Sequence, residues 1–284
     1  MSYLVPRAGT LLSHDMADYP EGIVLPVDKP YRWTSADVIR KLKFAAFRHF
    51  RKKNLKVGHA GTLDPLATGV LLVCIGNACK KAQELQDHDK EYIAGIRFGA
   101  TTPSYDLEKE VDRHFPYSHI TEAAVKEALK GFLGPQEQVA PLFSAKSVDG
   151  VRAYEMARKL YKSGNFSEIG PTALETLHTS RIVISELELL DFTEGIPEGI
   201  PCPSEVATNA SARIHVADTS ALGLPEASVR IVCSKGTYIR AFARDLGEAL
   251  ESGAHLGSLV RSRSGDFRIQ EALSVEEALA LLAP

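Results

Sequence analysis

The sequence has few cysteines and no long apolar run, and these scarcities exclude several classes of protein. Its four cysteines form neither a CxxC pair nor a metal-ligand spacing with histidine. Buried, reduced thiols are therefore expected, rather than a disulfide framework or a zinc site. No apolar stretch approaches membrane-spanning length, and the N-terminus lacks the pattern of a signal peptide. We expect a cytoplasmic protein with no membrane partner.

An overall excess of positive charge is also missing, since the formal net charge is -3. Cations are nevertheless concentrated in two places. The stretch from Arg40 to Lys56 holds eight lysines or arginines and no acid. A second group lies near the C-terminus, at Arg261, Arg263 and Arg268. Such clusters are either solvated faces or surfaces for nucleic-acid phosphates, and charge alone leaves both interpretations open.

Hydrophobic periodicity predicts helices and strands that are interspersed irregularly, which favours an α+β or mixed α/β fold over repeated βαβ units. Helices are expected over residues 34–50, 121–134, 153–164 and 236–253, with a short one after Ser274. Strands are expected over residues 22–30, 70–75, 91–100, 181–192 and 227–234. Gly134 and Gly253 are the expected helix stops, and Ser274 has capping-box spacing to Glu277.

The segment GHAGTLDPLATG, residues 58–69, holds one carboxylate, Asp64, in a glycine-rich loop before the apolar run 70–75. It contains no phosphate-binding glycine motif, and it precedes a strand rather than a helix, which argues against a phosphate cradle. An aspartate before proline is commonly only a turn former. Here the following strand would hold the loop rigidly, so Asp64 is also a candidate nucleophile or charge partner.

Arg240 and Tyr92 are the other candidate site residues that the pattern suggests. Arg240 falls at the start of a helix, where the helix dipole favours anions, so an acidic or phosphate partner is more plausible than usual. Tyr92 opens an alternating strand and would offer a stacking platform for a base. An exposed arginine and a core tyrosine are the ordinary alternatives.

Five segments, in order, resemble the motifs of the TruB family of tRNA pseudouridine synthases, which act on the T-loop uridine at position 55 of tRNA. GHAGTLDPLATGVL resembles the catalytic motif and is the most specific of them. The others lie at residues 25–35, 90–106, 233–247 and 253–267, with a linking stretch at 141–158. The resemblance implies a pseudouridine synthase fold with a largely antiparallel central sheet flanked by helices.

The resemblance implies catalytic roles for three residues. Asp64 would be the catalytic aspartate, Tyr92 the tyrosine that stacks on the target uracil, and Arg240 the arginine that pairs with the aspartate. Asp106 would be a second anchor for Arg240, although Pro103 stands where the family often has an aspartate, which makes this assignment less secure. The reaction would flip the uridine out of its loop, cleave the C–N glycosidic bond and rejoin the base through carbon.

Further positions match substrate-binding parts of the motifs, and Asp106 is also expected among the substrate-binding residues. His59 would help to fill the space that the flipped base leaves, and Leu259 would line the base pocket. Lys29 and Pro30 belong to the first motif and receive no catalytic role, and Lys29 is expected among the substrate-binding residues. In the same motif Arg32 stands where the family commonly has glycine, so the turn there is expected to differ.

The resemblance also implies a domain organisation and partners. Residues 1–21 would be an N-terminal extension, 22–284 one catalytic domain, and 193–226 a surface insertion. The residues after Phe267 are too few for the C-terminal RNA-binding PUA domain that family members commonly carry. The T-arm of tRNA is the expected partner, with no cofactor, metal, guide RNA or obligatory protein partner.

Two rival functions can be compared with the residues present. An RNA-binding protein that has lost catalysis would lack the aspartate or the arginine, and this sequence has both Asp64 and Arg240. A hydrolase or phosphotransferase with an aspartyl nucleophile usually needs further carboxylates for Mg²⁺, and residues 58–75 contain only Asp64.

Overall fold

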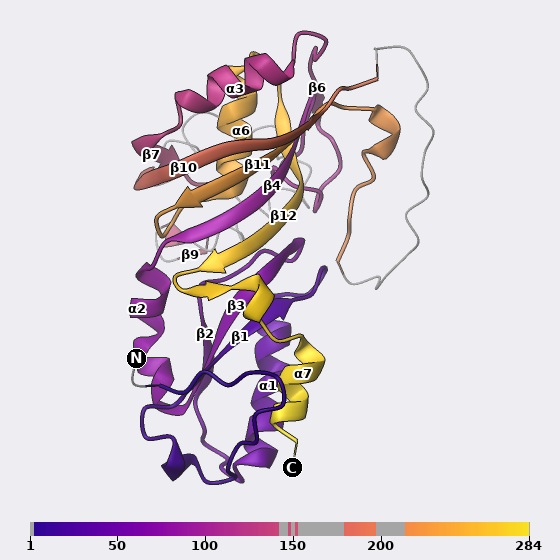
Figure 1. Ribbon diagram of the computed structural model, residues 1–284. Coiled ribbons are helices and arrows are strands. Elements are labelled where there is room, and N and C mark those ends of the chain that lie inside the picture. The colour runs from indigo at the N-terminus through magenta and orange to yellow at the C-terminus, as the bar shows by residue number, and fades with distance from the viewer. Residues whose placement is uncertain (1–2, 142–146, 149–150, 153–178, 197–213, 284) are drawn as a thin grey trace. The chain divides into compact units, whose positions relative to one another are not determined.

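The computed structural model describes residues 3–141, 147–148, 151–152, 179–196 and 214–283, and the chain divides into two compact units (Figure 1). Unit 1 consists of Met1–Ile93 and Ser258–Pro284, and unit 2 of Ala94–Gly257. Each unit is considered by itself. The helix expected over 153–164 and most of the linking stretch 141–158 lie outside the described residues.

Unit 1 is built around strand β3 (Ala67–Ile75), which is buried along nearly its whole length. Antiparallel partners of β3 are β1 (Ile23–Lys29) and the short β2 (Val57–Ala60). The part of β12 (Ala254–Ser264) that belongs to unit 1 runs parallel to β3, and β13 (Phe267–Arg268) pairs with β12. A strand buried on both faces reads as a continuous apolar run, which is why the sequence shows no alternation over 70–75.

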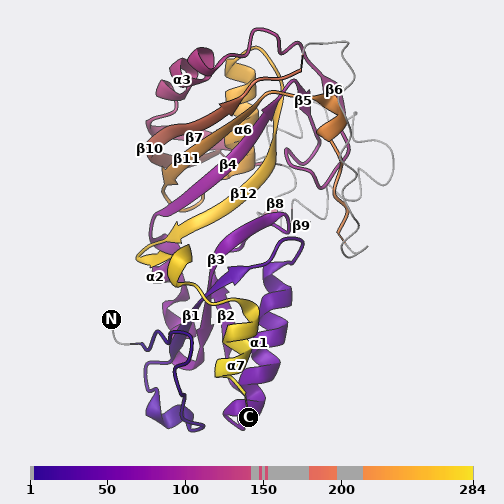
Figure 2. The same ribbon diagram turned by 45° about the vertical axis from the view of Figure 1, so that its right-hand side comes forward.

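Helices cover both faces of this sheet. Alternate side chains of β1 and β3 pack against α1 (Ser35–His49) and α7 (Val275–Leu281) in one core cluster. The intervening side chains form a second cluster with Leu85 of α2 (Ala82–Asp87) and with Phe267. Figure 2 shows α1 and α7 side by side. The alternation follows from the two-residue period of a strand.

Two helices of unit 1 begin with a capping box, and the one at Ser274 confirms a prediction. Thr34 caps α1 in a capping box with Asp37, and Ser274 caps α7 in the same way with Glu277. In α1 the residues Val38, Leu42 and Ala46 point into the core, and the lysines and arginines between them are exposed. Unit 1 also contains 3₁₀ turns at Met16–Asp18, Gly76–Lys81 and Ile269–Glu271.

Unit 2 contains strands in the order β4–β11–β10–β7. Their bounds are Lys90–Phe98, Glu226–Cys233, Thr179–Thr193 and Gly134–Val139, and the first residues of β4 belong to unit 1. The described pairings of β10 with β11 and with β7 are antiparallel. Helices α3 (Glu122–Lys130) and α6 (Ile239–Ala249) accompany this sheet (Figure 1). Smaller pairs are β5 (Ala100–Thr101) with β6 (Arg113–His114) and β8 (Ser147–Val148) with β9 (Val151–Arg152), and a 3₁₀ turn spans Ser220–Leu222.

The mixed fold class with a mostly antiparallel sheet is confirmed, but two predicted helix ends were wrong. Helix α3 ends at Lys130 with Gly131 as its cap, and Gly134 instead has φ +94° and begins β7. Helix α6 ends at Ala249, ahead of Gly253. Strands β2, β7 and β12 were not predicted, because each is short, polar or interrupted by glycine.

Three simpler expectations concern the described residues. No helix in this part of the chain combines the length and the apolar character that crossing a membrane requires. Cys74, Cys79 and Cys233 are free thiols, and two of them are buried. Residues 3–21 contact the core of unit 1: Leu4 bridges to Ile23, and Met16 and Tyr19 pack on the cluster beneath α1.

Candidate active site

Asp64 lies in a tight turn between β2 and β3, with its side chain half-buried. The amide of Ala67 donates to the carbonyl of Asp64 at 3.1 Å and closes the turn. The preceding residue, Leu63, is held from α1, since its amide donates to Oγ of Ser35 at 2.9 Å and its carbonyl accepts from the same hydroxyl at 3.1 Å. The start of α1 therefore fixes the backbone on one side of the carboxylate.

Lys29 supports the part of the turn that follows Asp64. Its side chain has no exposed surface, and Nζ donates to the carbonyl oxygens of Pro65 (3.2 Å), Pro30 (2.9 Å) and Trp33 (2.6 Å). All three acceptors are backbone groups, one of them directly after Asp64. The observed contacts make Lys29 a support for the turn, and its expected part in substrate binding stays a prediction.

The electrostatics around Lys29 follow from its burial. Loss of water lowers the pKa of its ammonium group from 10.5 to about 8; the charge of Asp64 acts in the opposite direction, and that of Arg261 acts in the same direction as burial. At neutral pH the group is thus still a cation.

Arg261 is a second buried cation, so the prediction that it lies on a positive surface is wrong. Its side chain is 1% exposed, so it does not belong to the positive surface predicted near the C-terminus. Nε donates to the carbonyl of Val70 at 2.7 Å, and the two terminal nitrogens reach the carbonyls of Gly61 (3.1 Å) and Thr62 (3.4 Å). One side chain from β12 thereby ties the loop before Asp64 to the strand after it.

A glycine is required where β12 passes β3. Gly69 has φ +99°, and a Cβ atom there would lie 2.3 Å from the carbonyl oxygen of Arg261, so only glycine permits the approach. Gly69 also donates its amide to Asp28 at 3.0 Å. Gly69 thus serves strand packing behind the turn, which is consistent with the absence of a phosphate-binding pattern.

Arg32 adopts the left-handed conformation, with φ +63°, and its amide donates to the carbonyl of Pro65 at 2.9 Å. This is the position at which glycine is common in the family that the sequence resembles. This conformation is one that glycine adopts readily, and the expectation of a different turn stays a prediction. An arginine in this region carries a strain of about 1 kcal/mol.

Leu259 and Tyr92 border the same part of unit 1. Leu259 is paired in register with Ala67, whose amide closes the Asp64 turn. Both Leu259 and Tyr92 are half-buried and pack against the cluster beneath α1. An aliphatic and an aromatic side chain therefore lie at the edge of the core that carries the carboxylate.

His59 lies on β2 and is half-buried. Burial and, secondarily, the charge of Arg261 lower the pKa of its imidazole, so the ring is neutral at pH 7. Among the described residues its Nδ1 atom has no hydrogen-bond partner. The ring therefore offers a neutral polar group on the strand that leads into the turn.

Arg240 and Asp106 are found together in unit 2. Arg240, in the first turn of α6, is 6% exposed; its Nε lies 3.8 Å from Oδ2 of Asp106, and one terminal nitrogen donates to the carbonyl of Ser104 at 3.1 Å. Asp106 is held in turn by the hydroxyl of Ser104 (2.6 Å) and the amide of Glu108 (2.9 Å). The arginine at the helix start is thus a buried, oriented cation.

Sequence reasoning missed Ser35 and Arg261 as supports of the turn. Ser35 was predicted only to lie in the helix over residues 34–50, and Arg261 only to belong to a charge cluster. The available signal was that both lie inside the segments that carry the resemblance, at residues 25–35 and 253–267. No group of three or more potential metal ligands occurs in the part of the chain that the structure describes.

Comparison with known proteins finds relatives that match most of the chain. Residues 48–194 match the family described as TruB family pseudouridylate synthase (N terminal domain). A tRNA pseudouridine synthase B of Phocaeicola vulgatus is 47% identical over 259 residues, which cover 91% of this chain and 92% of the relative. The protein of that name from Deinococcus radiodurans is 36% identical over 256 residues, covering 89% and 77%.

Solved structures show the same fold at lower identity. A Cbf5 chain in a Cbf5-Nop10-Gar1 complex has a TM-score of 0.57 and 22% identity, and the match covers 92% of this chain and 54% of that one. A chain of an H/ACA RNP bound to a substrate RNA containing 2'-deoxyuridine has a TM-score of 0.54 and 21% identity, covering 92% and 53%. This chain thus spans about half the length of these structural neighbours.

Proposed function

The chain belongs to the TruB family of pseudouridylate synthases, and we propose that it converts uridine to pseudouridine at position 55, in the T-loop of tRNA. Isomerisation of uridine in tRNA follows from the family and from relatives that are tRNA pseudouridine synthase B proteins. The T-loop position is supported by the motif GHAGTLDPLATGVL, which resembles that of enzymes acting there.

We propose Asp64 as the catalytic carboxylate. The observation that carries this role is the rigidity of its turn, which Ser35, Lys29 and Arg261 hold from three directions. A nucleophile must be held close to its productive geometry, and supporting hydrogen bonds provide that precision. The carboxylate would attack either the sugar C1′ or the uracil ring.

The reaction is an isomerisation, so its atoms balance without a co-substrate. The bond between C1′ and N1 breaks, the uracil turns, a bond forms between C1′ and C5, and a proton moves from C5 while N1 gains one. Oxidants, reductants and phosphate donors take no part. The protein must instead reach the base and keep it in place while it is detached, which requires flipping the nucleotide out of its stack.

Tyr92 and Leu259 are suited to hold the detached base. In this proposal Tyr92 stacks on the uracil ring, and Leu259 forms the aliphatic wall of the pocket. The pairing of Leu259 with Ala67, next to the Asp64 turn, supports the second assignment. His59, neutral through burial, would help to fill the place that the base leaves in the RNA loop.

Arg240 is proposed to act in the same reaction by keeping the catalytic carboxylate ionised and oriented. Support comes from the motif that contains it and from its burial beside Asp106, since a buried arginine needs anionic or carbonyl partners. Asp106 would then orient Arg240. The exposed residues Arg51, Lys52 and Lys53 would contact phosphates of the tRNA.

We further propose a stand-alone enzyme that acts on the T-arm in the cytoplasm, without guide RNA, membrane or obligatory protein partner. The support is that the chain has a higher sequence identity to a tRNA pseudouridine synthase B, 47%, than to a Cbf5 chain solved in a complex, 22%.

The experiment is to incubate the purified protein with an unmodified tRNA transcript in EDTA and to map pseudouridine by carbodiimide primer extension. A stop at position 55 is expected with the wild type and not with a transcript carrying cytidine there. A stop at another uridine alone would contradict the T-loop assignment, and complete dependence on added Mg²⁺ for a hydrolytic product would favour the rival chemistry.

A further inference from the structure

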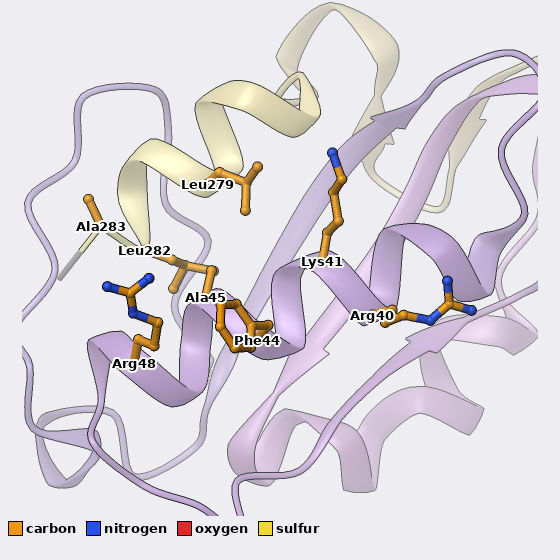
Figure 3. Close-up of a pocket in the computed structure, with 8 residues that line it drawn as sticks. All are labelled: Arg40, Lys41, Phe44, Ala45, Arg48, Leu279, Leu282 and Ala283. Carbon is orange, nitrogen blue, oxygen red and sulfur yellow. The ribbon is translucent and has the colours of Figure 1, made fainter. Parts of the chain in front are cut away.

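A groove of about 630 Å³ lies between α1 and α7 in unit 1 (Figure 3), and none of the residues that line it belongs to the Asp64 turn. Its floor is apolar and includes Leu279 and Leu282. Its rim carries three cations, Arg40, Lys41 and Arg48, and its lining contains no acid. Such a combination fits an occupant that has a flat or apolar part and also carries negative charge.

The ring of Phe44 stands at the groove and is 65% exposed, and it is the one exposed phenylalanine among the described residues. Arg40, Phe44 and Arg48 follow one another at intervals of four residues, so they form one stripe along α1. Successive members are separated by about 6 Å along the helix axis. The stripe therefore alternates cation, aromatic ring and cation.

The present contacts of these side chains leave them available. Arg40 pairs with Asp37 at 2.9 Å, but its side chain is 70% exposed, and such surface pairs are weak. Arg48 lies over the Phe44 ring at 5.8 Å, and Lys41 over the Trp33 ring at 4.7 Å. A nucleotide supplies a π face and a phosphate together, so it could contact both the aromatic rings and the cations that now lie over them.

We propose that this groove binds an unpaired nucleotide of the tRNA other than the target uridine, an inference that rests on the proposed function. The base would stack on Phe44 above the leucines of α7, and the flanking phosphates would lie against Arg40 and Arg48. Stacking on an aromatic ring together with cationic contacts to the backbone is the usual chemistry of single-stranded nucleic-acid binding.

The position of the groove favours RNA over an acidic protein. The hydroxyl of Ser35, at the first residue of α1, holds the residue before Asp64. At 1.5 Å per residue, Phe44 then lies about 14 Å along the helix from that turn. An RNA whose uridine reaches Asp64 would pass close to this face. The exposed cations Arg51, Lys52 and Lys53 continue the positive surface beyond the helix.

The test compares Phe44→Leu, which keeps apolar volume, with Phe44→Tyr, which keeps the ring. Affinity is measured with fluorescently labelled unmodified tRNA and with an isolated T-arm hairpin. We expect Phe44→Leu to weaken tRNA binding about tenfold and Phe44→Tyr to remain within twofold of the wild type. A loss with tRNA alone places the nucleotide outside the T-arm, and a loss with both RNAs places it within the T-loop.

A charge control completes the design. Arg48→Gln is expected to reduce the log–log salt slope of tRNA binding by about 1, whereas Lys130→Gln, at an exposed cation of α3, is expected to leave it unchanged. Circular dichroism and urea unfolding check that each variant is folded. Equal losses for Phe44→Leu and Phe44→Tyr would refute stacking.

Other occupants give distinct results. Unaltered RNA affinity in Phe44→Leu overturns the proposal, and binding of a glutamate-rich peptide that this variant abolishes would assign the groove to an acidic protein. A dimer of the wild type that the variant disrupts would assign it to a second copy. Pseudouridine formation by the wild type is assayed in the same preparations, so a failure of the proposed function is seen separately.

Discussion

A change of pH should alter the stability of the protein through Lys29 in a direction opposite to that of most buried lysine ion pairs. Lys29 is fully buried and donates to three backbone carbonyls around the Asp64 turn. Its pKa falls from 10.5 to about 8 on folding, chiefly through loss of water. The folded state therefore releases its proton at a lower pH than the unfolded chain does.

The sign and size of the effect follow from proton linkage. Between pH 8 and pH 10.5 the unfolded chain binds more protons at this group, so the free energy of unfolding rises with pH. The stability associated with a neutral Lys29 is fully present above pH 10.5. It is lost as the pH falls through 8, where Lys29 in the folded state takes up its proton. Its whole range is about 3 kcal/mol, of which about 1 kcal/mol is gained between pH 7 and pH 9.

The assay is urea unfolding of the wild type and of Lys29→Met at several pH values from 7 to 9.5. Other groups titrate equally in both proteins, so the difference between their free energies of unfolding isolates this lysine. The wild type should gain about 1 kcal/mol on the variant between pH 7 and pH 9. A difference that stays constant, or that shrinks as the pH rises, would refute the reasoning.

Three further changes test other parts of the structure. Arg261→Met should lower the free energy of unfolding by about 3–5 kcal/mol, because buried carbonyl groups lose a charged donor. Arg261→Lys should recover part of the loss. A urea midpoint of Arg261→Met equal to that of the wild type would contradict this. Gly69→Ala should cost about 2 kcal/mol or more because of its φ and the backbone of Arg261, and thermal unfolding at the wild-type temperature would disprove the close approach. Replacing Arg51, Lys52 and Lys53 by glutamine should reduce the log–log salt slope of tRNA binding by up to about 3, and an unchanged slope would remove this segment from the interface.

Local signals were sufficient for much of unit 1. The helix after Thr34 could be predicted because its capping box and its apolar face lie within a few residues of each other. The burial of β3 could be predicted from the unbroken apolar run after Gly69. The rigidity expected of the Asp64 turn could be inferred from the strand that follows it.

What could not be predicted depends on contacts between distant segments. Arg261 appeared to be a surface cation, because its buried acceptors are provided by loops about 200 residues away in the chain. Strand β12 was not expected, since its parallel pairing with β3 is a register that no local pattern specifies. Helix α3 ends at Lys130, with Gly131 and not Gly134 as its cap, because the chain must turn there to begin β7.

The central claim is that a rigidly held carboxylate at position 64 does the chemistry and that binding does not depend on it. The most direct measurement is the single-turnover rate of pseudouridine formation by Asp64→Asn at saturating tRNA, beside the dissociation constant of the same variant. We expect no detectable product with tRNA affinity within about twofold of the wild type. Product formed at a rate comparable to that of the wild type would contradict the account.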